Sequence, residues 1–100
     1  MSSGVEEQLA LPTYQPSTVL SQTHAFSATT VVSRSRDSVE KVGAFYRDAL
    51  ARGGWQTVAA STTLPWSTHL AARRGQEGVT IQISSIGLWG CSISVSTYPV

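Results

Sequence analysis

Residues 37–55, DSVEKVGAFYRDALARGGW, hold the clearest helix signal of the chain. Apolar side chains in this stretch recur three and four residues apart, so they fall on one face of a helix. The charged side chains fall largely off that face. The spacing predicts an amphipathic helix over residues 38–52, which packs on a sheet. Its apolar positions are Val39, Val42, Phe45, Tyr46, Ala49 and Leu50.

Both ends of the predicted helix carry boundary signals. Asp37 is followed three residues later by Glu40, which is the spacing of a capping box with Asp37 as N-cap. After the last turn, Gly54 can adopt the positive φ that closes a helix. With Gly54 in that place, Trp55 and Leu50 make the apolar contact of a Schellman ending.

The remaining sequence favours β-strands. Residues 17–36 set Val, Leu and Phe among Thr and Ser, and a turn or bulge near Ser27-Ala28 divides them into two strands. After the helix, residues 55–61 and 68–73 form short strands, and a loop of residues 74–78 leads from the second of these into the next strand.

The last two strands alternate strictly between apolar and polar residues, which predicts one face toward the helix and one away from it. The apolar series are Val79, Ile81, Ile83 and Cys91, Ile93, Val95. The element order β-β-α-β-β-β-β predicts an α+β domain with one amphipathic helix on a mostly antiparallel sheet of five or six strands.

The composition indicates a neutral, hydroxyl-rich surface. The 100 residues fit one domain, the net charge is +1, and only 13% of residues are charged. With 15 Ser and 11 Thr, most of the polar surface consists of hydroxyl groups. So small a net charge gives no strong general attraction to nucleic acid or membranes, and we expect no nucleic-acid partner.

The first residues read as a leader. Residues 1–16 are expected to be flexible, with Pro12 and Pro16 favouring extended backbone, and residues 17–100 form the domain. The start lacks the basic and apolar regions of a signal peptide, and no apolar run is long enough to span a membrane. It fits a cytoplasmic start, or a start after a removed signal or lipid anchor. Low charge with many Ser and Thr favours an extracytoplasmic location.

Few residues suggest catalysis. His24 and His69 lie in predicted strands; on adjacent strands they can bind a metal or act as acid and base, and otherwise they are surface histidines. Cys91, the only cysteine, alternates with apolar residues and is expected to be a buried thiol. Asp37 and Glu40 resemble a pair of catalytic carboxylates, but helix capping already explains their spacing. No catalytic residue and no cofactor is predicted.

The arginines provide a second candidate. Arg34, Arg36, Arg73 and Arg74 can contact phosphate. No aromatic residue alternates with them as a base-stacking surface requires. We therefore expect solvated surface charges.

Two features favour a binding surface. The polar series of the last two strands carries no charge, although exposed strands usually carry Lys or Glu against edge pairing. Such a face suits a protein partner, a second copy or a glycan; otherwise it is simply a hydroxyl-rich surface exposed to water. Trp66 and Trp89 stand beside turn residues and are either contact residues or lids over the core. The polar series comprises Thr80, Gln82, Ser84, Ser92, Ser94 and Ser96.

The helix motif carries a resemblance. The Asp…Glu…Val…Phe-Tyr…Leu…Gly-Trp pattern of residues 37–55, with LPTY at 11–14 before it, resembles uncharacterised bacterial extracytoplasmic domains, often found on lipoproteins. The matched residues are the helix cap, the apolar side chains along one face of the helix, and the residues that end the helix. The resemblance thus implies a fold and a compartment but no reaction.

The same stretch also resembles a second family. Arg36-Asp37 followed by Phe45-Tyr46 is similar to the first helix of the glyoxalase/bleomycin-resistance superfamily. That resemblance implies a ligand or metal cup built in a dimer. Its first-strand metal ligand has no counterpart here, because residues 31–36 contain neither His nor Glu.

We therefore expect a non-enzymatic binding or assembly module that contacts a protein or another copy through the polar sheet face and the Trp66 and Trp89 loops. The alternative is a glyoxalase-like cup, for a small ligand or a metal, that uses His24 or His69 with Glu77 under the helix.

Overall fold

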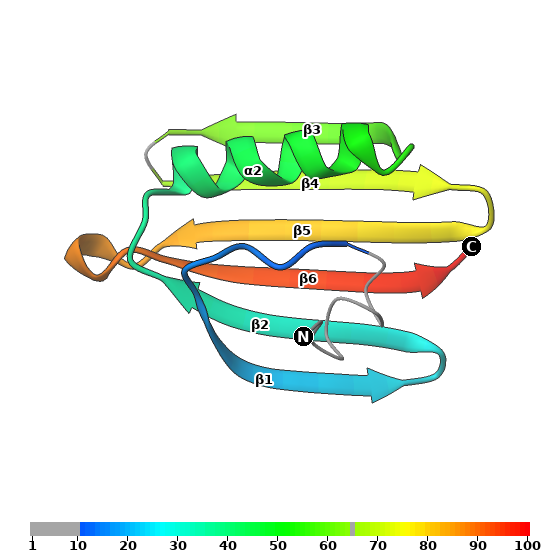
Figure 1. Cartoon of the computed structure of the whole chain (residues 1–100), viewed down its shortest axis with the longest axis horizontal. Helices are drawn as coiled ribbons and strands as arrows, with labels where there is room; N and C mark the ends of the chain where they lie inside the picture. The colour runs from blue at the N-terminus through cyan, green and yellow to red at the C-terminus, as the bar shows by residue number, and fades with distance from the viewer. Residues whose placement is uncertain (1–10, 65) are drawn as a thin grey trace.

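Six antiparallel strands form one sheet with the order β1-β2-β6-β5-β4-β3 (Figure 1). The computed structural model describes residues 11–64 and 66–100. One helix joins β2 to β3, and a 3-10 turn joins β5 to β6. The element order β-β-α-β-β-β-β and the α+β architecture are confirmed. The elements are β1 Thr18–Ala25, β2 Ala28–Ser35, α2 Val39–Arg52, β3 Gln56–Thr63, β4 Ser67–Arg74, β5 Glu77–Ser85, η1 Gly87–Trp89 and β6 Cys91–Pro99.

The core lies on one side of this sheet. Helix α2 packs over β3, β4 and β5, and the segment 11–16 runs along β5 and β6 beside it (Figure 1). The alternation along β5 and β6 predicted this side correctly, since the apolar series is buried. The core comprises Leu11, Tyr14, Val31, Val39, Val42, Tyr46, Ala49, Leu50, Trp55, Leu70, Ala72, Val79, Ile81, Ile83, Cys91, Ile93 and Val95.

The helix begins one residue later than the capping-box pattern predicts. Ser38, not Asp37, is the N-cap, and its Oγ accepts a hydrogen bond from the amide of Lys41 (3.2 Å). A capping box would require Glu or Gln at position 41, so the predicted Asp37–Glu40 box is wrong. The Asp37 carboxylate instead contacts Tyr14 and Lys41.

The helix ends as the glycines predict. Gly54 has φ +76°, its amide donates to the Ala51 carbonyl (3.3 Å), and the amide of Trp55 donates to the Leu50 carbonyl (3.0 Å). These two bonds define a Schellman motif. Leu50 and Trp55 are both buried. The Arg74 guanidinium lies 4.4 Å from the centre of the Trp55 ring and closes this end from outside.

Two connections differ from the predicted boundaries. The five-residue loop predicted at 74–78 is a two-residue turn, because Arg74 and Glu77 already pair across β4 and β5. Gly75 (φ +60°) permits so short a turn. The split near residue 27 is confirmed, since β1 and β2 are joined through Phe26 and Ser27, both at positive φ.

The expected leader divides in two. Residues 1–10 lie outside the described residues. Of the remainder, Leu11 and Tyr14 are buried in the core, so residues 11–16 pack as part of the domain.

Glycine substitutions test this geometry. A Cβ at Gly90 (φ +106°) would lie 2.0 Å from the Ser35 carbonyl oxygen, whereas a Cβ at Gly54 meets nothing within 4 Å. Gly54→Ala should therefore cost only the strain of positive φ, about 1–2 kcal/mol. Gly90→Ala adds overpacking against β2 and should cost about 2–5 kcal/mol. Urea unfolding measures both, and equal losses would contradict the close approach of the β5–β6 turn to β2.

Candidate functional site

The second face of the sheet is uncovered by any described residue. We call it the outer face; on its four central strands it consists of the side chains opposite the core. Its middle is made of small hydroxyl groups that their neighbours half bury, together with the exposed amide of Gln82. On the four central strands the whole outer face comprises Thr30, Val32, Arg34, Ser67, His69, Ala71, Arg73, Thr80, Gln82, Ser84, Ser92, Ser94, Ser96 and Tyr98.

Register brings all six predicted polar residues together. Ser94 stands opposite Gln82 on one side and Val32 on the other, and Ser92 stands opposite Ser84. Thr80 stands opposite Ser96, whose Oγ lies 3.0 Å from Thr30 Oγ1. The predicted polar series is thus one continuous hydroxyl surface.

The few charges on this face are basic and lie away from its middle. Strands β5 and β6 carry none there, Arg34 lies on β2, and Arg73 lies on β4 with His69. No Asp or Glu of the described strands points to this side. A partner that docks there would meet hydrogen-bonding groups and little electrostatic repulsion.

The two edge strands are also open. Every residue of β1 and β3 is exposed, and neither strand contains a charged residue. Each strand has an irregularity in register, at Leu20 in β1 and at Val58 in β3, and both of these apolar side chains are more than half exposed. Bulges reduce edge pairing, but the charges that usually oppose it are missing here.

The two loop tryptophans lie at one end of the sheet and not on the outer face. Trp66 joins β3 to β4 and Trp89 ends η1, and their side chains are 65% and 77% exposed. Neither covers the core, so the lid interpretation is wrong for both. The two turns are neighbours, since the Ser85 amide donates to the Trp66 carbonyl (2.7 Å).

The sequence reasoning missed two members of this group. Leu64 is half exposed and Leu88 is fully exposed, next to the tryptophans in the same turns. We call Leu64, Trp66, Leu88 and Trp89 the tip cluster. The signal was the sequence Gly87-Leu88-Trp89-Gly90, two apolar residues between glycines, which packing alone does not explain.

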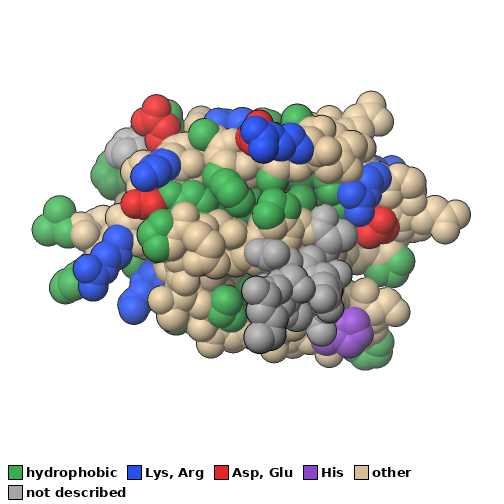
Figure 2. All heavy atoms as spheres, in the orientation of Figure 1, with side chains coloured by type: hydrophobic (Ala, Val, Ile, Leu, Met, Phe, Trp, Pro, Cys, Tyr) green, Lys and Arg blue, Asp and Glu red, His purple; other side chains and the backbone are tan. Residues whose placement is uncertain are grey.

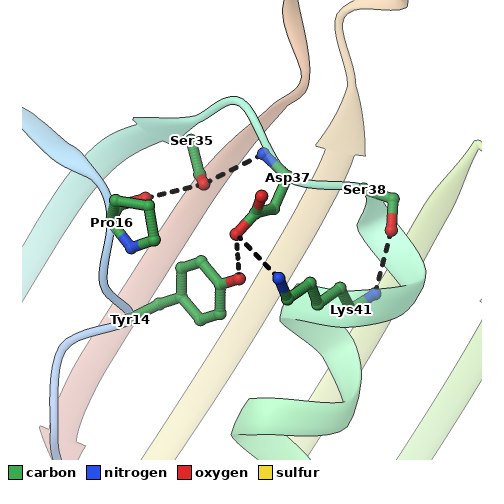
Figure 3. A network of polar contacts seen from close by, with 6 residues as sticks. All are labelled: Tyr14, Pro16, Ser35, Asp37, Ser38 and Lys41. Atoms are coloured by element: carbon green, nitrogen blue, oxygen red, sulfur yellow. Dashed lines mark hydrogen bonds and ion pairs between the residues drawn. The ribbon is translucent and has the colours of Figure 1, made fainter.

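A polar network joins the segment 11–16 to the start of α2 (Figure 3). The Tyr14 hydroxyl donates a short hydrogen bond to Asp37 Oδ2, and Lys41 Nζ lies 3.7 Å from the same oxygen. Ser35 Oγ donates to the Pro16 carbonyl (2.8 Å) and accepts from the Asp37 amide (3.2 Å). Burial first, then the hydrogen bond to Asp37 and its negative charge, raise the pKa of Tyr14 to about 12.

The histidines are not brought together. His24 lies on edge strand β1 with its Nδ1 2.8 Å from Thr29 Oγ1, on the core side, and His69 lies on β4 on the outer face. Three strands separate β1 from β4, so the pairing on adjacent strands that we considered is wrong. Across residues 11–64 and 66–100, no three His, Cys, Asp or Glu side chains converge as metal ligands.

Glu77 shares a hollow with His24 but not with His69. The hollow, about 460 Å³, opens at the end of the sheet opposite the tip cluster and is also lined by Thr29 and Tyr98. It is not the predicted pocket under the helix. Cys91 is fully buried as expected, and burial raises the pKa of its thiol.

Comparison with known proteins gives one match. A family model described as START domain-like covers residues 16–96. The chain belongs to the START domain-like family. No curated protein and no solved structure matches this START-like domain. The family match covers β1 to β5, the helix and the first part of β6, but assigns no residue a role. Among the helices described, none is long and apolar enough to cross a bilayer.

The Tyr14–Asp37 contact predicts a pH dependence. Because the folded pKa of Tyr14 lies above the ordinary value of 10, its contribution to stability is complete below pH 10 and is lost as pH rises toward 12. Asp37→Asn should lower the pKa of Tyr14 toward 10. Ultraviolet titration of tyrosine, assigned with Tyr14→Phe, measures this shift.

The matched control is Asp48→Asn, which removes an exposed carboxylate paired with Arg52 at 2.9 Å. It should leave the tyrosine titration unchanged. An Asp37→Asn titration identical to wild type would contradict the contact.

Proposed function

We propose that this START-like domain is a non-enzymatic binding or assembly module, and that its outer face docks onto protein, with a second copy of the chain as the first partner. One observation carries the proposal: one side of a six-stranded sheet is uncovered by the described residues and uncharged on its two central strands. The resemblance of the helix motif to extracytoplasmic, often lipid-anchored, domains supports a location outside the cytoplasm.

The chemistry of the face supports close contact with another sheet. Serine and threonine side chains are short, so a partner can approach the backbone closely. Hydroxyl groups both donate and accept hydrogen bonds, so two copies of the face can satisfy each other. The symmetry of such a dimer requires a self-complementary surface, and a neutral hydroxyl surface is self-complementary.

A small core gives a further reason for assembly. A chain of 100 residues buries a modest share of its surface, and burial in an oligomer adds stability. The open edges of β1 and β3 offer a second route to the same result, since neither carries a charge against pairing.

A second candidate rests on the hollow at the opposite end. His24 and Glu77 line it together with Thr29 and Tyr98, a set of polar groups that suits a small polar ligand. This is the part of the glyoxalase-like alternative that the geometry favours.

Thermal unfolding with one equivalent of Zn²⁺ or Ni²⁺ tests whether this hollow holds a metal. A rise in Tm that His24→Ala abolishes supports a metal-holding cup, and an unchanged Tm contradicts it.

The main proposal predicts a mass that depends on concentration. The molar mass measured by light scattering behind size exclusion should rise from the 10.7 kDa of one chain toward the mass of a dimer as the protein concentration increases. Ser94→Lys places an ammonium in the middle of the face with no carboxylate opposite, and should weaken the dimer about tenfold or more.

Ala44→Lys is the matched control, because it adds the same charge to the exposed side of α2. It should leave the dimer unchanged. A strict monomer at every concentration would contradict self-assembly, and equal weakening by both variants would show that the contact lies elsewhere.

A further inference from the structure

The end of the sheet that carries the tip cluster exposes several large apolar side chains that do not pack into the core. Leu88 is fully exposed, and Trp89, Trp66 and Leu64 are exposed beside it, in two neighbouring turns. In Figure 2, hydrophobic side chains project at the left end of the molecule, with Lys and Arg side chains beside them. In Figure 1, η1, the β3–β4 turn and the connection from β2 to α2 all lie at that end.

The backbone of the tip is fixed. Gly87 (φ +75°) and Gly90 (φ +106°) bracket the turn, and the Ile86 amide donates to the Gly90 carbonyl (3.0 Å). Gly90 packs directly on the end of β2, because a Cβ there would lie 2.6 Å from the Arg36 Cα. The turn therefore holds Leu88 and Trp89 outward and seats them beside Arg36.

Two cations flank this apolar group. Arg36 lines one hollow of about 270 Å³ with Leu88 and Trp89, and lines a second of the same size with Arg34 and Thr18. Neither arginine forms an ion pair with a carboxylate of the described chain. The carboxylate next to them in sequence, Asp37, is already engaged by Lys41 and the Tyr14 hydroxyl.

We propose that this end of the domain docks onto the surface of an anionic lipid bilayer. Leu88 and the two tryptophans enter the interfacial layer, where aromatic rings with a polar edge are favoured. Arg34 and Arg36 contact the lipid phosphates. The overall charge of +1 does not oppose this, because the attraction comes from the local pair of arginines.

The shape of the end favours a membrane over a protein. Apolar side chains that protrude from a narrow turn need a matching pocket to bind a protein, whereas a fluid interface closes around them. The tip cluster shares no residue with the outer face; only Arg34 belongs to the outer face and to this docking site, at the end of β2 opposite Ser92. The inference does not depend on the proposed function.

Vesicle co-sedimentation and tryptophan fluorescence test the proposal on the whole chain. The protein should bind vesicles of phosphatidylcholine mixed with phosphatidylglycerol, with a blue shift of emission, and bind phosphatidylcholine alone much more weakly. The double variant Leu88→Ser/Trp89→Ser should lower partitioning about tenfold or more. Arg34→Gln and Arg36→Gln should each lower it about fivefold.

Controls come from the opposite end of the sheet. Phe26 is fully exposed in the β1–β2 turn and Arg73 lies near the far end of β4. Phe26→Asn and Arg73→Gln should bind as wild type does, and so should Ser94→Lys, which targets the outer face. None of the substituted side chains belongs to the packed core, so each variant should keep the Tm of the wild type, and an unchanged Tm confirms its fold.

Failure of the folded protein to bind anionic vesicles would overturn the proposal. So would binding that Phe26→Asn weakens as much as the tip variants do. Loss of a protein dimer in the tip variants, with no vesicle binding by wild type, would assign the tip cluster to a protein contact instead.

Discussion

Burial on a single side of the sheet is the constraint on which the rest of the structure depends. Six strands about 4.8 Å apart span about 24 Å, whereas one helix is about 10 Å wide. Helix α2 therefore covers only part of the sheet, over β3, β4 and β5. The segment 11–16 extends this cover beside the helix, with Leu11 and Tyr14 buried in the core and Tyr14 bonded to Asp37 at the start of the helix. Nothing in the described chain is left to cover the other side.

This constraint produces two surfaces with different chemistry. The outer face is neutral in its middle and rich in hydroxyl groups, which suits another protein surface of similar kind. The tip cluster is narrow, apolar and flanked by Arg34 and Arg36, which suits a fluid, anionic interface. The same chain can use both, since Trp66 and Trp89 lie at the end of the sheet and not on its face. Membership of the START domain-like family is consistent with either use and specifies neither.

Local patterns in the sequence predicted much of the fold. The spacing of apolar residues predicted helix α2, and the alternation in β5 and β6 predicted which side chains point away from the core. The N-cap was misassigned because Asp37 and Ser38 are both good caps, and only the distant contact with Tyr14 decides between them. The exposure of Trp89 and its position beside Arg36 follow from the pairing of β2 with β6, residues far apart in sequence. Such pairings leave no local pattern in the sequence. For that reason the net charge of the whole chain gave no indication of a local basic site.

The most direct test of one-sided burial is the attenuation of methyl signals by a paramagnetic cosolvent in dilute solution. Thr30 and Thr80 carry methyl groups on the outer face, and Ile81 and Ile93 carry methyl groups in the core of the same or the neighbouring strand. The account predicts strong attenuation of both threonine signals and little attenuation of both isoleucine signals. Threonine methyls as protected as those of Ile81 and Ile93 in the monomer would contradict it, since the outer face would then be covered by the chain itself.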